Sequence, residues 1–196
     1  MRLKGLIPGV PSFLETPNVF VSTTGVSFYE QCFPPSSIQL GISFTAMHWL
    51  TKQPVQGITD ATHHSISKNT AEIDAFAAQA AKDWELVLLQ RAKELVPGGQ
   101  MVIVNFTLDE QGQCLGNVQR ENGAKRNMYQ VKNDIWLEMA EEGIITHDEY
   151  TNTSFANYYR NVDEFVAPFA ADGTSPLSHR HFVESRYPDG GIVPPP

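Results

Sequence analysis

Residues 69–106, NTAEIDAFAAQAAKDWELVLLQRAKELVPGGQMVIVNF, contain the longest periodic segment of the chain and a strand that follows it. Apolar side chains recur at helical spacing, which predicts an amphipathic helix over about residues 70–96. Asn69 or Thr70 can cap its start. The segment VPGG (96–99) ends it, because a glycine there can adopt a left-handed turn. The predicted apolar face comprises Ile73, Phe76, Ala77, Ala80, Trp84, Val87, Leu88 and Leu95.

The segment after this helix predicts part of a parallel sheet. MVIVNF (101–106) is continuously apolar, as expected of a strand that is covered on both faces. Similar runs predict strands near residues 19–22 and 38–44. This strand–helix–strand order is typical of the α/β class, in which helices cover both faces of a parallel sheet. Ligands of such sheets bind beyond the carboxyl ends of the strands, and His48 and Trp49 follow the second strand there.

The remaining segments predict shorter elements. Residues 28–33 and 46–51 predict short helical turns, and residues 52–68 a loop. Helices are expected over 128–142, from the segment IITHDEY (144–150), and over about 163–169, and a late strand over 179–184. We interpret the whole chain, 1–196, as one domain.

Composition restricts the class of partner. The chain has 196 residues and a formal net charge of −8, which disfavours a nucleic acid or an anionic membrane as a partner. No apolar run reaches the about 18 residues that would span a bilayer. The opening segment MRLKGLIPGVPSF lacks the apolar core of a secretory signal. Cys32 and Cys114 are far apart and in no metal or redox spacing, so a reducing cytoplasm is expected.

Four blocks of the sequence resemble one family. They are "SFYEQCFPPSSIQL" with the following "HWL", "DWELVLLQRAKELVPGGQMVIV", "WLEMAEEGIITHDEY" and "NYYRNVDEFVAPF". In this order they resemble the SABATH carboxyl methyltransferases, over about residues 18–170. The resemblance implies a Rossmann-like class I methyltransferase sheet and a helical cap at about 110–175 that covers the acceptor pocket. It also implies S-adenosylmethionine as cofactor and a small carboxylic acid as substrate.

The chain departs from the family pattern at both ends. The glycine-rich first strand and the acidic end of the next strand, which grip the cofactor in the family, have no match before Gly25. A last helix and strand have no match after residue 185, and Val26 replaces a usual glycine. The resemblance therefore implies a partial domain, whether a fragment, a truncated gene or a shortened form. This chain alone is expected to bind S-adenosylmethionine about 10-fold or more weakly than an intact relative.

The resemblance implies roles for four residues at the start of the pattern. Trp49 would point its indole N–H at the substrate carboxylate, and His48 would lie beside it as a second donor or a constraint on shape. Ser27 and Phe28 would contact the adenine end of the cofactor. The alternatives are a core tryptophan, a structural histidine, and a helix cap followed by a core aromatic residue.

Three further residues are implied as walls of the acceptor pocket, namely Met128, Tyr129 and Tyr158. Helical residues with apolar neighbours are often core instead. The pair His63-His64 suggests a metal site, but no cysteine or acidic residue at a suitable spacing completes one, so no metal is expected and a loop is the better interpretation.

Two classes of function remain open. The first is methyl transfer to a small carboxylic acid, by an enzyme or by a truncated remnant of one. The second is a non-catalytic module that binds a partner or forms a homodimer through an exposed sheet edge.

Overall fold

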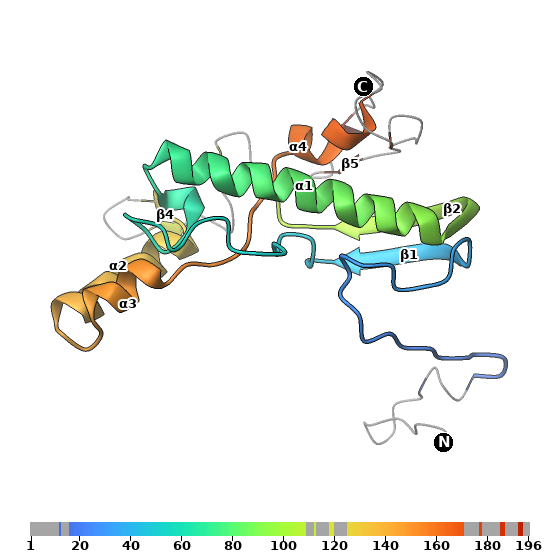
Figure 1. The fold of residues 1–196 in the computed structure, drawn as a ribbon, viewed down its shortest axis with the longest axis horizontal. Helices are drawn as coiled ribbons and strands as arrows, with labels where there is room; N and C mark the ends of the chain where they lie inside the picture. Colours follow the sequence, from blue (N-terminus) through green and yellow to red (C-terminus); the bar gives the residue numbers. More distant parts are fainter. Residues whose placement is uncertain are drawn as a thin grey trace.

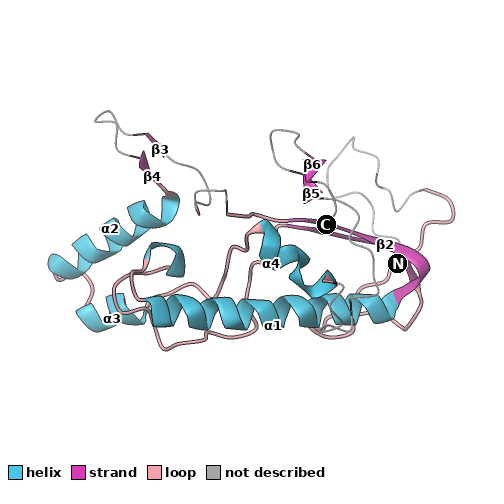
Figure 2. Cartoon of the chain, turned by 90° about the horizontal axis from the view of Figure 1, so that it is seen from above, coloured by secondary structure: helices cyan, strands magenta, loops and turns pink. Residues whose placement is uncertain are grey.

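The computed structural model describes residues 12, 16–108, 112, 118–119, 125–170, 177, 185–186 and 192–193. The long helix α1 (Thr70–Glu94) runs along the parallel strands β1 (Ile38–Phe44) and β2 (Leu95–Val104), as Figures 1 and 2 show. Beyond the carboxyl ends of the strands lie α2 (Met128–Glu141) and α3 (His147–Asn152). The chain then returns to α1 through α4 (Val162–Val166).

Helix α1 confirms the strongest prediction from the sequence. The side chain of Asn69 caps it by accepting a hydrogen bond from the amide of Glu72. Its apolar stripe is buried, with Phe76, Trp84 and Val87 almost fully enclosed. This stripe divides between two clusters of the core, one with Ile58 and Tyr158 around Phe76, and one with Met47 and the strands around Trp84.

Helix α1 ends at Glu94 with an extended cap at Leu95, so the predicted glycine cap is wrong and VPGG lies within β2. The first half of β2, where its pairing with β1 is irregular, needs glycine for two reasons. Gly98 has a φ of +79°, in the left-handed region that favours glycine. At Gly99 a Cβ would lie 2.9 Å from the carbonyl oxygen of Val96 and 3.0 Å from that of Ile38. The close approach lets β2 pair with β1 in parallel, from Leu40 opposite Gln100 to Phe44 opposite Val104.

The expectation that both strands are covered on two faces is wrong for the described residues. Side chains alternate along β1 and β2, and Met101 and Ile103 pack towards α1 while the other face stays open. That open face is 46% to 64% exposed at Leu40, Ile42, Phe44, Val102 and Val104. A continuous apolar run shows that both faces suit burial, but it does not show what covers them.

Several shorter predictions are also corrected. Residues 19–22 form no strand, and Phe20 is exposed, because the segment has no neighbouring strand to pair with among the described residues. Residues 28–30 and 47–48 are turns, not helices. Within the predicted loop 52–68, a 3₁₀ turn, η2, covers His64–Ile66.

The helices after residue 125 confirm their predictions. Asn127, Thr146 and Asn161 each begin a helix with a reciprocal capping box. A further 3₁₀ turn, η3, spans Ala167–Phe169. Short two-residue ladders pair β3 (Val118–Gln119) with β4 (Lys125–Arg126) and β5 (Ser185–Arg186) with β6 (Ile192–Val193). The predicted strand 179–184 and part of the predicted cap, 110–175, lie outside the described residues.

Candidate functional site

The carboxyl ends of β1 and β2 lie at the same edge of the sheet because the strands are parallel. After β1 the chain stays bonded to β2, with the amide of Thr45 2.7 Å from the carbonyl oxygen of Val104. Thr45 has a φ of +51°, so the chain turns sharply there. Met47 and His48 then enter the interior, and Trp49 remains at the surface.

An extended segment, residues 155–160, pairs with the chain beyond β1. The amide of Leu50 donates to the carbonyl of Ala156 at 2.8 Å, and the amide of Tyr158 donates to that of His48 at 2.7 Å. Trp49 and Asn157 form an antiparallel bridge between them. Successive side chains of an extended segment point to opposite sides, so this pairing sorts the residues of 155–160 into two groups.

His48 is buried, with 7% of its surface exposed. Its ring stacks on Tyr159, with centroids 5.4 Å apart, and lies 5.2 Å from the ring of Trp49 and 5.9 Å from that of Phe106. Burial lowers the pKa of His48, and the charge of Arg160 lowers it further. The imidazole is therefore neutral at pH 7. Its Nδ1 is buried and has no hydrogen-bond partner among the described residues, so it can still accept or donate one hydrogen bond.

Trp49 is not a core residue, because 48% of its surface is exposed. The hydroxyl of Tyr29 donates a hydrogen bond to the carbonyl oxygen of Trp49, and this bond holds the backbone of Trp49 in place. Burial, and then the charge of Asp83, raise the pKa of Tyr29 to about 12, so this donor keeps its proton. The next residue, Thr51, donates from its amide and its hydroxyl to the buried carboxylate of Asp83, at 2.8 and 2.7 Å. The indole is thus held at the edge of the sheet and remains accessible.

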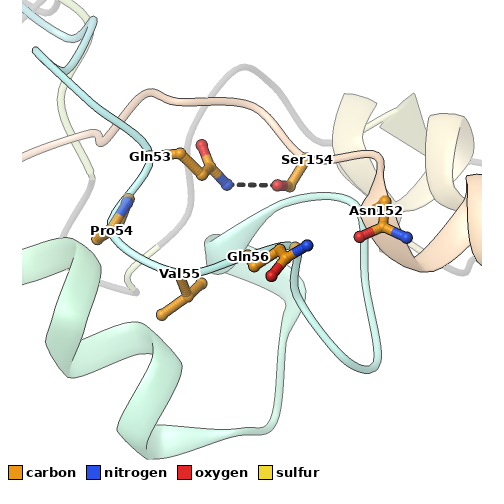
Figure 3. A pocket seen from close by; sticks show the side chains of 7 residues that line it. Gln53, Pro54, Val55, Gln56, Asn152 and Ser154 are labelled. Carbon is orange, nitrogen blue, oxygen red and sulfur yellow. Dashed lines mark hydrogen bonds between the residues drawn. The ribbon is translucent and has the colours of Figure 1, made fainter.

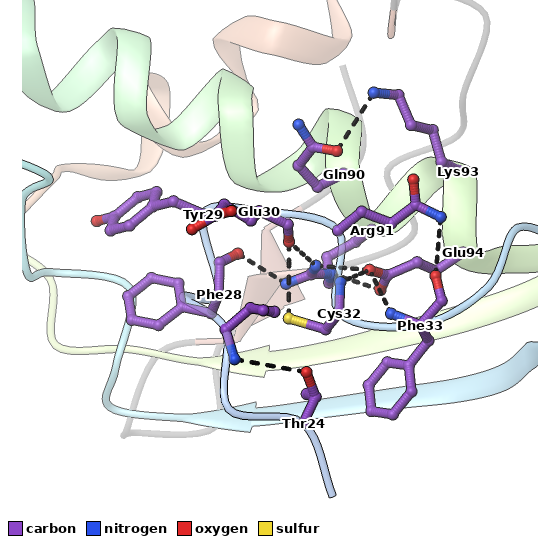
Figure 4. Close-up of polar contacts among 12 residues, drawn as sticks. Thr24, Phe28, Tyr29, Glu30, Cys32, Phe33, Gln90, Arg91, Lys93 and Glu94 are labelled. Carbon is purple, nitrogen blue, oxygen red and sulfur yellow. Dashed lines mark hydrogen bonds and ion pairs between the residues drawn. The ribbon is translucent and has the colours of Figure 1, made fainter.

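Ser27 and Phe28 lie in a turn before β1, in the segment that Figure 4 shows. The hydroxyl of Ser27 accepts a hydrogen bond from the amide of Tyr29 at 3.3 Å, and Ser27 is exposed. The ring of Phe28 is partly buried, 4.4 Å from that of Tyr29. Ser27 therefore stabilises a turn and caps no helix, and the ring of Phe28 keeps part of its surface exposed.

One ion pair attaches this segment to α1 (Figure 4). Arg91 donates to the carbonyl of Phe28 at 2.8 Å and to that of Glu30 at 2.7 Å, and it pairs with Glu94 at 2.8 Å. The Glu94 carboxylate accepts the amide of Cys32 at 2.5 Å. Burial raises the pKa of Glu94, but its bonds to Arg91, Cys32 and Phe33 outweigh burial and leave it below its ordinary value.

Tyr129 and Met128 open helix α2. Tyr129 is buried, and its hydroxyl lies 2.6 Å from that of Tyr159, the residue stacked on His48. Met128 packs against the same small cluster from a partly buried position. The structure thus brings Tyr129 towards His48 through Tyr159.

Tyr158 points the other way. Its ring stacks on His64 at 4.6 Å and joins the cluster around Phe76 on α1. Its hydroxyl donates to Glu164 at 2.8 Å, and burial followed by this bond raises the pKa of Tyr158. The alternation of the extended segment places Tyr159 beside His48 instead. Sequence reasoning missed Tyr159, although its place next to Tyr158 in "NYYRN" was a signal.

His63 and His64 are buried against aromatic rings and do not form an exposed loop. His63 stacks on Tyr129 at 3.5 Å, and its Nε2 lies 2.7 Å from the Oδ1 of Asn157. Burial lowers the pKa of His64 to about 4. No group of three His, Cys, Asp or Glu side chains suited to a metal ion occurs in the described part of the chain.

Arg160 connects three parts of the site. Only 2% of it is exposed, and its guanidinium donates to the carbonyls of Met47 and Ala80, each at 2.6 Å. Its own carbonyl accepts the hydroxyl of Thr107 at 2.7 Å. The end of β1, the middle of α1 and the chain after β2 are therefore held by one residue.

Two hollows occur near these residues, and neither is centred on His48. The larger, about 550 Å³, is open and is lined by residues 53–57 with Asn152 and Ser154 (Figure 3). It shares no residue with the site around His48, and Gln53 spans it by donating to Ser154. The smaller, about 110 Å³, lies between α1 and α4 beside Tyr158, Arg160 and Glu164. Neither hollow contains the exposed indole of Trp49.

Comparisons with known proteins identify the family and the fold of the chain. Residues 6–186 match the family described as SAM dependent carboxyl methyltransferase. A jasmonate O-methyltransferase of Arabidopsis thaliana is 28% identical over 173 residues, and the match covers 81% of this chain and 39% of that relative. A 3,7-dimethylxanthine N-methyltransferase of Camellia sinensis var. assamica is 24% identical over 174 residues, covering 84% of this chain and 45% of that relative.

The fold is also that of a methyltransferase. A solved structure, a loganic acid methyltransferase with SAH, matches with a TM-score of 0.64 at 24% identity, over 78% of this chain and 44% of that one. This confirms an incomplete Rossmann-like α/β fold. The chain spans less than half the length of these three relatives. With nine-tenths of its length matched by the family, the chain belongs to the SAM-dependent carboxyl methyltransferases.

Proposed function

We propose that the protein transfers a methyl group from S-adenosylmethionine to the carboxylate of a small organic acid, and that the acceptor binds at His48 and Trp49. The observation that carries this proposal is the exposed indole of Trp49 beside a buried, neutral His48 at the carboxyl edge of a parallel sheet. Family membership supplies the class of reaction.

The chemistry asks little of the protein beyond placement. S-adenosylmethionine supplies a methyl group that its positive sulfur makes electrophilic. A carboxylate is already a nucleophile, so the site needs no strong base, and the new O–CH₃ bond replaces the S–CH₃ bond without proton transfer. The chain's own part is to remove water from the carboxylate and to aim one oxygen. The indole N–H of Trp49 fixes the other oxygen, and the ring of Tyr159 limits the space around His48.

Ser27 and Phe28 are proposed as contacts of the cofactor. An exposed hydroxyl and a partly exposed aromatic ring are suitable groups for the edge and the face of an adenine. Tyr29 connects this segment to the backbone of Trp49, so the two proposed binding regions are in direct contact.

The proposed acceptor is small and partly apolar. Met128, Tyr129 and Tyr158 remain proposed wall residues, and the orientation of Tyr159 favours it over Tyr158. We also propose that the helices within about 110–175 act as a cap over the acceptor, since segment 155–160 contacts the ring of His48 through Tyr159 and α2 contacts Tyr159 through Tyr129. A net charge of −8 argues against nucleic acid, and an unpaired Cys32 agrees with a cytoplasmic location. No helix in the described part of the chain could cross a bilayer.

The test is Trp49→Phe in the full-length protein, assayed against a panel of small carboxylic acids. Loss of one hydrogen bond to a charged group is worth about 1.5–3 kcal/mol, so kcat/KM for the acceptor should fall about 10- to 150-fold. Affinity for S-adenosylmethionine and the melting temperature should change little, because the indole is half exposed. Full activity in Trp49→Phe would remove Trp49 from the mechanism.

Trp136→Phe is the matched control. This tryptophan lies on α2 and contacts none of the rings around His48. It should keep the activity of the wild-type protein. Methylation of a ring nitrogen in place of a carboxylate would contradict the proposed acceptor class. It would not contradict the assignment of the chain to the family.

A second candidate is a non-catalytic module that forms a homodimer. The open, apolar face of β1 and β2 favours it, because large exposed apolar surfaces often mark contacts between proteins. Light scattering on the protein and on Ile42→Glu, which places a charge in that face, distinguishes the candidates. A dimer that Ile42→Glu dissociates supports the module, and a monomer in both cases excludes it.

A further inference from the structure

The acceptor side of the site rests on a row of buried polar contacts that the proposed reaction does not use. It begins at His63, which is fully buried, and continues through Asn157 and Tyr129 to Tyr159. Tyr159 is the ring stacked on His48, at 5.4 Å and an angle of 18° between the ring planes. The row therefore ends at the group that shapes the acceptor position.

The direction of each bond follows from one backbone amide. The amide of Ser65 lies 3.1 Å from the Nδ1 of His63, and a backbone N–H can only donate. Nδ1 must therefore carry the lone pair, and the proton of the neutral ring is on Nε2. The hydroxyl of Ser65, 2.7 Å from Nδ1, can donate to it as well.

The remaining bonds are then determined in order. The Nε2–H of His63 donates to the Oδ1 of Asn157 at 2.7 Å, so the amide nitrogen of Asn157 faces Tyr129 and donates to its hydroxyl at 3.2 Å. The hydroxyl of Tyr159, at 2.6 Å, is the acceptor within reach of the Tyr129 proton in the described contacts. Every proton in the row points towards Tyr159.

The histidine stays neutral in this environment. Burial lowers the pKa of His63 to about 2, and the neighbouring charges of His64 and Lys132 act in the same direction. The Nζ of Lys132 lies 5.7 Å from the centroid of the Tyr129 ring. A neutral imidazole has one donor nitrogen and one acceptor nitrogen. It can therefore accept at Nδ1 and donate from Nε2, as the hydrogen bonds of the row require.

We propose that His63 is a positioning residue for the acceptor, because as the Nε2–H tautomer it orients Asn157 and Tyr129 and so holds Tyr159 in place against His48. The inference rests on the proposed function for its kinetic consequence, but the geometry of the row can be tested without activity. His63 stacks on Tyr129 and lies 5.7 Å from the ring of Tyr159, so it acts on the proposed acceptor position through these two tyrosines.

The structural test uses proton–nitrogen NMR of the protein with ¹⁵N-labelled histidine. His63 should appear as the Nε2–H tautomer and should not titrate between pH 5 and 8. Tyr129→Phe, which removes one hydroxyl and keeps the ring, should shift the ring resonances of His48. A His63 in the Nδ1–H form, or a His48 spectrum that Tyr129→Phe leaves unchanged, would overturn the proposal.

Tyr150→Phe is the matched control for this variant. It removes another buried tyrosine hydroxyl, which bonds to Asn133 at 3.1 Å outside the row. It should lower stability by a similar amount to Tyr129→Phe and leave the His48 resonances unchanged. If the two variants shifted the His48 resonances equally, the shifts would come from a general loss of stability and not from the row holding Tyr159 in place.

The kinetic test compares two variants at His63 in the full-length protein. His63→Leu removes the donor and should raise KM for the acceptor about 5- to 10-fold, with KM for S-adenosylmethionine unchanged. His63→Gln keeps a side-chain N–H and should recover most of the loss. Equal effects of Leu and Gln, or a loss shared by both substrates, would contradict positioning. If the wild-type protein methylates no acid, the proposed function fails, while the NMR test still decides the row.

Discussion

The two sides of the site are built differently. The proposed acceptor side, around His48, is assembled from four separate segments and is buried except at Trp49, with its polar groups linked to one another. The proposed cofactor side, residues 25–33, lies on the surface and is attached to α1 mainly through Arg91 and Glu94. A buried network resists local change, whereas a surface segment can open without unfolding the rest. We expect the two sides to respond to different perturbations.

The largest effect should come from Arg160, the residue that ties the acceptor side together. Arg160→Met removes the buried donor that bonds to the carbonyls of Met47 and Ala80, so the free energy of unfolding should fall by about 3 kcal/mol. Urea denaturation measures this loss. Arg126→Met is the control, since the pair of Arg126 with Asp134 is partly exposed and should be worth at most about 1 kcal/mol. Equal losses of unfolding free energy in both variants would refute the proposal that Arg160 stabilises the acceptor side more than an exposed ion pair does.

Acid should weaken the acceptor side next. His63 and His64 have pKa values of about 2 and about 4 in the folded chain, against about 6.5 when unfolded. As pH falls below 6.5, these two histidines bind protons in the unfolded chain but stay unprotonated in the folded chain. Stability present above pH 6.5 is therefore lost as pH falls towards the folded values. Between pH 7 and 5.5 the two histidines together should cost about 2–3 kcal/mol.

Denaturation at a series of pH values tests this dependence. Paired carboxylates such as Glu94, whose folded pKa is also lowered, lose their contribution only below about pH 4.3, so the range 7 to 5.5 isolates the histidines. His64→Phe keeps the stacking on Phe76 and Tyr158 and should remove the share of His64 from the slope, which leaves the shares of His63 and of His48, whose pKa is also lowered. A slope unchanged in His64→Phe would mean that His64 titrates normally in the folded protein.

The smallest effect should be local and confined to the cofactor side. Glu94→Gln weakens the attachment of Arg91 and of the amides of Cys32 and Phe33, at a cost of about 1 kcal/mol. Hydrogen exchange at Cys32 and Phe33 should accelerate, while exchange at the amide of Tyr158, which bonds to His48, should not. Glu149→Gln, in an exposed capping box, is the control. Acceleration on both sides would show that they form one cooperative unit.

Much of the architecture could be predicted from the sequence. The apolar spacing of Phe76, Trp84 and Val87 predicts α1 to within two residues. The resemblance of four blocks predicts the family, which the comparisons confirm. The position of His48 and Trp49 at the carboxyl edge follows from strand order alone. These features depend on neighbours within a few residues along the chain, or on the order of the blocks. Both can be read from the sequence alone.

The tertiary structure decided the rest. Which tyrosine faces His48 depends on how segment 155–160 pairs with residues 48–50, and a shift of one residue would exchange Tyr158 and Tyr159. His63 meets Asn157 across 94 positions of sequence, and Arg160 meets Met47 across 113. Residues 19–22 have strand composition but no pairing partner among the described residues, and the apolar strands have one covered face. The periodicity of a segment shows which of its faces can be buried. Only long-range packing determines which residues cover that face.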